Sequence, residues 1–312
     1  MTSLTTLALQ ARGVTLEWPL ADPALPHLTV HDPAEADWLH LLIGEAAHVA
    51  LLRGGEFHPE WDRPLAARLR HLAFGHWLRA WWPASVLDGV PPLDTVLLDA
   101  ELALLTDELD EVMAFSPDGE VPLDGAALRA LRHPLAARAL GLLGLEAPAP
   151  AEPTREDYAL AAGDRLTPGP AAVLSGTSPH AWGAVPAGRV DAAEHAVAWV
   201  LEVTDRPALS VAVQLLPGAR VEGIAVHATA GPVQAAGVLG ADGTVQLALP
   251  LEAAAAWALT AADVDVRIGV DVSEDGAERA SVRRLIAQRL TGVPDRNGPL
   301  YQAERELIVD DW

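Results

Sequence analysis

Glu45 and His48 have the residue types and the spacing of a metal site. The Glu-x-x-His spacing places two side chains on adjacent turns of a helix, where both can reach one metal ion. Asp37 and His40 fall along the same arc of the helical wheel. One hypothesis is therefore a metal-dependent enzyme whose carboxylate and imidazole ligands are Glu45 and His48.

The same residues have a simpler interpretation, which we favour: they form the polar face of an amphipathic helix. A carboxylate-bridged di-iron bundle needs the Glu-x-x-His spacing on two helices, and the predicted third helix contains no histidine. The sequence also lacks the Gly-x-Ser-x-Gly pattern of a nucleophilic serine. We therefore expect no catalytic set and no bound cofactor.

The segment 71–83, HLAFGHWLRAWWP, concentrates three tryptophans, a phenylalanine and two histidines. On a helical wheel these residues and their neighbours form two opposite apolar faces, which predicts a helix buried on both sides. We favour packing in a core over the alternative, a partner-binding surface. In that alternative the partner-binding residues are Phe74, Trp77, Trp81, Trp82 and, in the acidic C-terminal tail, Trp312.

The composition excludes several chemistries. All 21 basic residues are arginine, so no lysine can form a Schiff base or bind phosphate in a P-loop. Cysteine is absent, which excludes thiol nucleophiles, thiolate zinc sites and disulfides. The net charge of −22 repels phosphates and argues against binding to nucleic acid. An acidic decoy that imitates nucleic acid is a further alternative, although the acids are scattered among arginines.

The composition also bears on the source and the compartment of the protein. Residues with AT-rich codons are scarce, with one asparagine and no lysine, which indicates a bacterium with a GC-rich genome. The first residues lack the basic and apolar regions of a signal peptide. No apolar run approaches the length of about 18 residues that a membrane span requires. We therefore expect a cytoplasmic protein with no membrane contact.

The N-terminal part is predicted to be mainly helical. Alternating residues on either side of Arg12-Gly13 predict a short hairpin. Caps, prolines and glycines then delimit successive helices, which we expect to pack as an antiparallel bundle. These predicted helices cover residues 32–52, 64–82, 93–115 and 125–143.

The C-terminal part changes to a period of two, which is typical of strands. An Ala-Pro linker at 146–153 and an irregular segment to 188 precede six predicted strands, of which two are joined as a hairpin at 240–243. A final helix is predicted at 277–290. The expected fold is α+β with two domains: a helical bundle at 1–145, and an antiparallel β-sandwich with a terminal helix at 189–312.

These observations predict a non-catalytic role. A tryptophan excess, a sandwich of the binding type and the lack of a complete catalytic set favour a protein–protein interaction or scaffold component of a bacterial cytoplasmic assembly. Its partner would be another protein or a second copy of the chain. The metal-dependent enzyme and the acidic decoy are the two alternatives.

Overall fold

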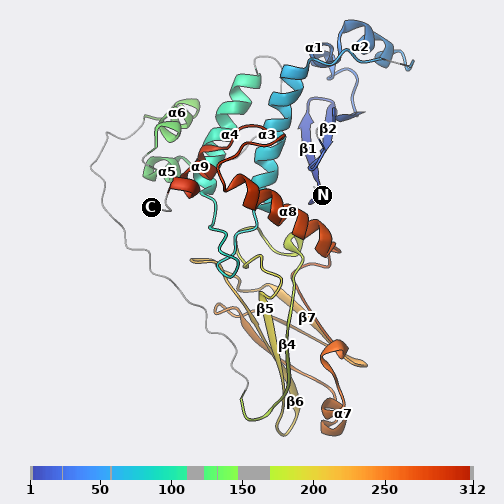
Figure 1. The fold of residues 1–312 in the computed structure, drawn as a ribbon, viewed down its shortest axis with the longest axis vertical. Helices are drawn as coiled ribbons and strands as arrows, with labels where there is room; N and C mark the ends of the chain where they lie inside the picture. The colour runs from blue at the N-terminus through green and yellow to red at the C-terminus, as the bar shows by residue number, and fades with distance from the viewer. Residues whose placement is uncertain are drawn as a thin grey trace. The chain divides into compact units, whose positions relative to one another are not determined.

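The computed structural model describes residues 3–22, 24–56, 58–110, 123–131, 133–146 and 169–309. It confirms a mixed α+β fold, in which helices predominate in the N-terminal part and antiparallel sheets in the C-terminal part (Figure 1). Most of the predicted Ala-Pro linker lies outside the described residues, as does Trp312.

The elements of the described residues have the following bounds. The helices are η1 (Asp37–Leu39), α1 (His40–Ile43), α2 (Glu45–Leu52), α3 (Arg63–Trp81), α4 (Thr95–Asp110), α5 (Gly125–Ala130), α6 (Pro134–Leu142), η3 (Trp182–Ala184), α7 (Ala253–Trp257), η4 (Ala261–Asp263), α8 (Gly276–Arg289) and α9 (Gln302–Val309). The strands are β1 (Thr6–Ala11), β2 (Val14–Pro19), β3 (His27–Val30), β4 (Ala172–Ser178), β5 (Val197–Val203), β6 (Pro207–Val213), β7 (Ala225–Ala230), β8 (Val233–Val238), β9 (Thr244–Ala248) and β10 (Val264–Ile268).

By its internal contacts the chain divides into two compact units. Unit 1 comprises residues 1–80, 93–153 and 280–312, and unit 2 comprises residues 81–92 and 154–279. These boundaries differ from those predicted, because the C-terminal residues join the helical unit and the short segment 81–92 joins the sheets.

Buried polar contacts explain both differences. In unit 1 the fully buried Arg289 guanidinium lies 4.5 Å from the centre of the Phe74 ring on α3, and the Tyr301 hydroxyl donates to the carbonyl of His71 on the same helix. In unit 2 the buried carboxylate of Asp191 accepts hydrogen bonds from the Ser85 hydroxyl and from the Val86 amide, both at 2.6 Å. Partners remote in the sequence therefore decide which unit holds each segment.

The predicted N-terminal hairpin is confirmed and gains a third strand. β1 pairs with β2 in antiparallel register, and β3 pairs with the other edge of β2. Gly13 occupies the turn with a φ of 70°. A Cβ atom at this position would lie 2.2 Å from the carbonyl oxygen of Asp32, so only glycine fits.

Two of the predicted helices are interrupted. The helix expected at 32–52 starts only at Asp37, with η1 and α1, and Gly44 separates α1 from α2 because it adopts φ 84° and ψ 151°. The helix expected at 125–143 is divided into α5 and α6 where His133 caps the second segment and Pro134 begins it. The helix expected at 93–115 corresponds to α4 up to its described end.

The predicted helix at 64–82 corresponds to α3, and burial of both its faces is confirmed. Leu69 and Leu72 are buried on one face, and Phe74, Trp77 and Leu78 are buried on the other. Gly75 allows Tyr301 to pack close to the backbone of α3, since a Cβ atom at this position would lie 2.5 Å from the Tyr301 hydroxyl oxygen. The helix is therefore a central element of unit 1.

Unit 2 contains two antiparallel sheets in its described residues, with strand orders β4-β5-β6-β9 and β10-β7-β8. Side chains from both sheets meet in one hydrophobic cluster, to which the first sheet contributes Leu201 and Val211 and the second contributes Val226 and Val266. Burial on this shared side explains the alternating sequence pattern.

Three predictions for this unit were wrong in detail. The loop 240–243 does not close a hairpin, because β8 pairs with β7 and β9 pairs with β6 in the other sheet. The segment expected to be irregular contains β4, whose small residues hide the strand pattern. The last strand ends at Ile268, because Gly269 takes a φ of 79° that ends the extended run.

None of the helices in the described part of the chain combines the length and the apolar composition needed to span a bilayer.

Candidate metal centre

Asp37, His40 and His48 form a group of possible metal ligands in unit 1. One ligand atom from each side chain lies within 4.8 Å of the ligand atoms of the other two. Asp37 and His40 are exposed, whereas His48 is 5% exposed. The group therefore has one buried side and one side open to solvent.

His48 is the buried member of this group. Its Nε2 atom is buried and has no hydrogen-bond partner among the described residues. A buried polar atom without a partner costs free energy, and most such atoms in native proteins are satisfied. A metal ion bound to the imidazole would remove that cost.

The ring of His40 is held by its own backbone. Its Nδ1 atom lies 2.6 Å from the carbonyl oxygen of Asp37, a distance at which Nδ1–H donates and Nε2 keeps its lone pair. Metal-binding histidines commonly donate their second N–H to a carbonyl in this way. The rings of His40 and His48 are 6.1 Å apart between centroids, with an interplanar angle of 42°.

The break at Gly44 creates this arrangement. Asp37 and His40 precede the break and His48 follows it. The three residues therefore do not lie on one continuous helix, and a single helical wheel does not give their relative positions. Backbone contacts fix the segment before the break. The Trp38 indole donates to the carbonyl of Arg12 at 2.9 Å, and the Glu60 amide donates to the carbonyl of Ile43 at 2.9 Å.

Of the two predicted metal ligands, the structure brings only His48 into the group. Glu45 is exposed in the first turn of α2 and is not part of the cluster found among the described residues. Glu45 and His48 keep the i, i+3 spacing within α2, but Asp37 and His40, which precede the break at Gly44, are grouped with His48 and not with Glu45. Asp37 and His40 take the place of Glu45, and their position on the same predicted arc was the available signal.

Two imidazoles and one carboxylate suit a divalent transition metal such as Zn²⁺ or Fe²⁺. Ligands bound to one ion at about 2.1 Å are separated by roughly 3 to 3.5 Å, so the side chains would close by small rotations. Three protein ligands leave coordination positions for water or substrate. The exposure of Asp37 and His40 leaves these positions accessible to solvent.

The aromatic segment on α3 occupies a different environment. Phe74 is fully buried, Trp77 is 3% exposed, and their rings stack with centroids 5.5 Å apart. The Trp77 indole donates to the carbonyl of Leu4 at 3.0 Å, and the Arg289 guanidinium lies 4.5 Å from the centre of the Phe74 ring. As these side chains are packed inside unit 1, they have no surface to offer a partner.

Trp81 and Trp82, two further predicted partner-binding residues, are half-buried. Trp82 donates from its indole to the carbonyl of Pro91 at 2.9 Å. Trp81 lies against Gly183 in unit 2, and its indole nitrogen is buried with no partner in the described part of the chain. Trp312 lies outside the described residues.

Comparison of the chain with protein-family models, with curated proteins and with solved structures finds no match.

Proposed function

We propose that the protein binds a divalent transition metal through Asp37, His40 and His48. The observation that carries this proposal is the buried Nε2 atom of His48, which lacks a partner beside two further potential ligands. This proposal keeps the metal-dependent function considered from the sequence, with Asp37 and His40 in place of Glu45.

An open site of this kind supports Lewis-acid chemistry. A metal ion held by three protein ligands can lower the pKa of a bound water or polarise a substrate oxygen. The protein's residues would hold the ion, and the carbonyl of Asp37 would orient the imidazole of His40 toward it. We propose hydrolysis or a related polar reaction as the class of activity for an enzyme of this type.

Metal binding is tested by calorimetric titration of the metal-free protein with Zn²⁺ and Co²⁺. The expected result is one site per chain. His48→Ala should weaken binding by more than about 100-fold, because loss of an outer partner alone costs 10–100-fold. Glu45→Gln is the matched control on the same helix and should leave affinity unchanged. No binding to the wild type, or equal losses in the two variants, would exclude the site.

We propose, as a second candidate, the non-catalytic protein–protein interaction expected from the sequence, in a bacterial cytoplasmic assembly. The favouring observation is Trp257 on α7, which is 65% exposed while the other described tryptophans are buried or half-buried. The shared core of the two sheets supports a β-sandwich in unit 2, an architecture common in binding modules. The helices of unit 1, in which α4 contacts α5, α6 and α9, support a bundle.

Self-association through Trp257 is tested by sedimentation of the wild type and of Trp257→Ser over a range of concentrations. An interface hot spot would weaken assembly by about 2 kcal/mol or more when it is replaced. Val238→Ser is the control, because Val238 on β8 is also an exposed apolar residue. A wild type that stays monomeric would remove the self-associating form of this proposal.

A further inference from the structure

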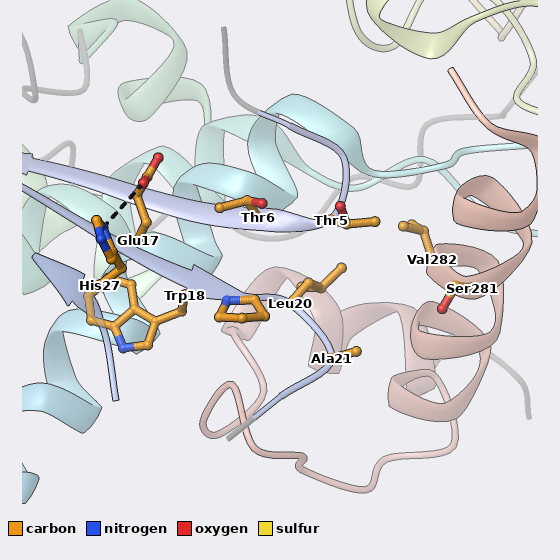
Figure 2. A pocket seen from close by; sticks show the side chains of 10 residues that line it. Thr5, Thr6, Glu17, Trp18, Leu20, Ala21, His27, Ser281 and Val282 are labelled. Carbon is orange, nitrogen blue, oxygen red and sulfur yellow. Dashed lines mark ion pairs between the residues drawn. The ribbon is translucent and has the colours of Figure 1, made fainter. Parts of the chain in front are cut away.

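A second candidate site lies within unit 1, at the ends of β1 and β2 and beside the adjoining turn of α8 (Figure 2). It is a pocket of about 430 Å³, a volume typical of sites for small molecules. Pro19 and Ala21 supply exposed apolar lining above the buried side chains of Trp18, Leu20 and Val282. The pocket does not involve the metal ligands, so its role is independent of the proposed metal site.

One wall of this pocket is held in place by arginines. The buried Arg70 guanidinium donates to the carbonyl of Pro19 at 3.0 Å and to that of Leu20 at 3.4 Å. Arg296 donates to the carbonyl of Ala21, and the Leu20 amide donates to the carbonyl of Thr5 at 2.8 Å. These bonds fix the chain that follows β2. The pocket is therefore preformed, and ligand binding carries no free-energy cost for ordering this wall.

Polar groups are few and unevenly placed around the pocket. Figure 2 shows Glu17 and His27 next to each other on one side and Ser281 on α8 on the other. Glu17 is the only acidic lining residue, and the lining contains no arginine. The nearest nitrogen of His27 is 4.0 Å from the Glu17 carboxylate, at the limit of an ion pair, and both side chains are largely open to solvent.

The charge of the pocket selects the type of ligand. A carboxylate without an arginine partner favours a cation, and the net charge of −22 attracts cations to the molecule. The apolar lining favours a ligand whose body is hydrocarbon. An anionic ligand with the same hydrocarbon body would meet only the second condition.

We propose that this pocket binds a small organic cation, namely a primary amine with an apolar body. The ammonium group contacts Glu17, and the hydrocarbon part lies against Pro19 and Ala21.

Titration with hexylammonium, followed by NMR of the tryptophan indole N–H groups, tests this proposal. Hexanol and hexanoate are the matched neutral and anionic probes. Hexylammonium should bind more tightly than hexanol, and hexanoate should bind most weakly. Glu17→Gln should weaken hexylammonium about fivefold, as expected for an exposed ion pair, and leave hexanol unchanged. Equal binding of the three probes, or no effect of Glu17→Gln, would overturn the assignment.

A second pair of variants tests whether the cation occupies this pocket. Ser281 is exposed and lines the pocket, so Ser281→Trp fills it from the solvent side without disturbing the core. Ala287→Trp, at an exposed position of α8 outside the lining, is the control. Binding lost in the first variant and kept in the second supports the pocket, provided that both melt as the wild type does. Binding kept in both would place the amine elsewhere and contradict the proposal.

Discussion

Helix α3 and the η1–α1–α2 segment differ in what surrounds their polar and aromatic groups. On α3, Arg70 donates to Asn297 and to backbone carbonyls, and Trp77 donates to the carbonyl of Leu4. In the other segment, Leu41 and Leu52 are exposed and the buried Nε2 atom of His48 lacks a partner among the described residues. The aromatic and basic residues of α3 therefore have a structural role.

The difference shows which observation points to a site. Most members of the aromatic group on α3 are explained by packing, and the Trp81 indole, although it lacks a partner among the described residues, is only a donor and cannot hold a metal ion. The buried nitrogen of His48 beside Asp37 and His40 can do so. The three predictions below test that contrast, beginning with the largest expected effect.

Trp77→Ala should lower the free energy of unfolding by about 3–5 kcal/mol, because it opens a cavity beneath Phe74. Urea denaturation measures this loss. Zn²⁺ affinity at the Asp37 group should not change in the folded variant. Trp257→Ala, on an exposed surface, should change stability by less than about 0.5 kcal/mol. A stable Trp77 variant with altered association would mean that the α3 face is an interface.

Acidification should destabilise α3 through His76. Burial, with a smaller contribution from Arg79, lowers the pKa of His76 from 6.5 to about 4. Between these values the unfolded chain binds a proton that the folded chain does not, so stability falls as the pH decreases. The expected loss is about 2 kcal/mol from pH 7 to pH 5.

Denaturation of the wild type and of His76→Gln at both pH values isolates this effect. Carboxylates that also take up protons act in both proteins, so the difference between the two pH dependences reports His76. Parallel pH dependences would contradict the assignment.

Gly44→Ala should destabilise the η1–α1–α2 segment by at least about 1 kcal/mol, because its backbone angles are accessible almost only to glycine. A Cβ atom there would meet Glu60 Cβ at an ordinary 3.5 Å, so the cost is conformational. We also expect Zn²⁺ affinity to fall, since relief of the strain moves His48 away from His40.

Gly54→Ala is the matched control for this variant. Gly54 also has a positive φ, of 69°, but it follows α2 and no atom lies within 4 Å of a Cβ atom there. The Gly54→Ala variant should be less stable than the wild type and should keep its Zn²⁺ affinity. Equal losses of affinity in both variants would show that general destabilisation, and not the position of His48, controls binding.

Part of the candidate site could be predicted from the sequence. The arc containing Asp37, His40 and His48 was visible, because each histidine and acid has a definite angle on a helix. The wheel placed Glu45 on the same arc as well, because it assumes one continuous helix, whereas the chain breaks at Gly44 between His40 and Glu45. Gly44 was visible, but a single glycine is tolerated inside many helices, so its presence did not determine the break.

The sequence by itself determined the types of the elements. The period of the apolar residues and the positions of turn residues are local properties. They were sufficient to predict the β1–β2 hairpin, α3 with its two buried faces, and strands β5 to β10. Only the tertiary structure decided which elements belong together. The contacts of Arg289 with Phe74 and of Tyr301 with His71 hold the C-terminal residues in unit 1, and the hydrogen bonds of Asp191 hold residues 81–92 in unit 2. β8 and β9 lie in different sheets. These outcomes depend on partners far apart along the chain, because burial and hydrogen-bond satisfaction are properties of the folded chain as a whole.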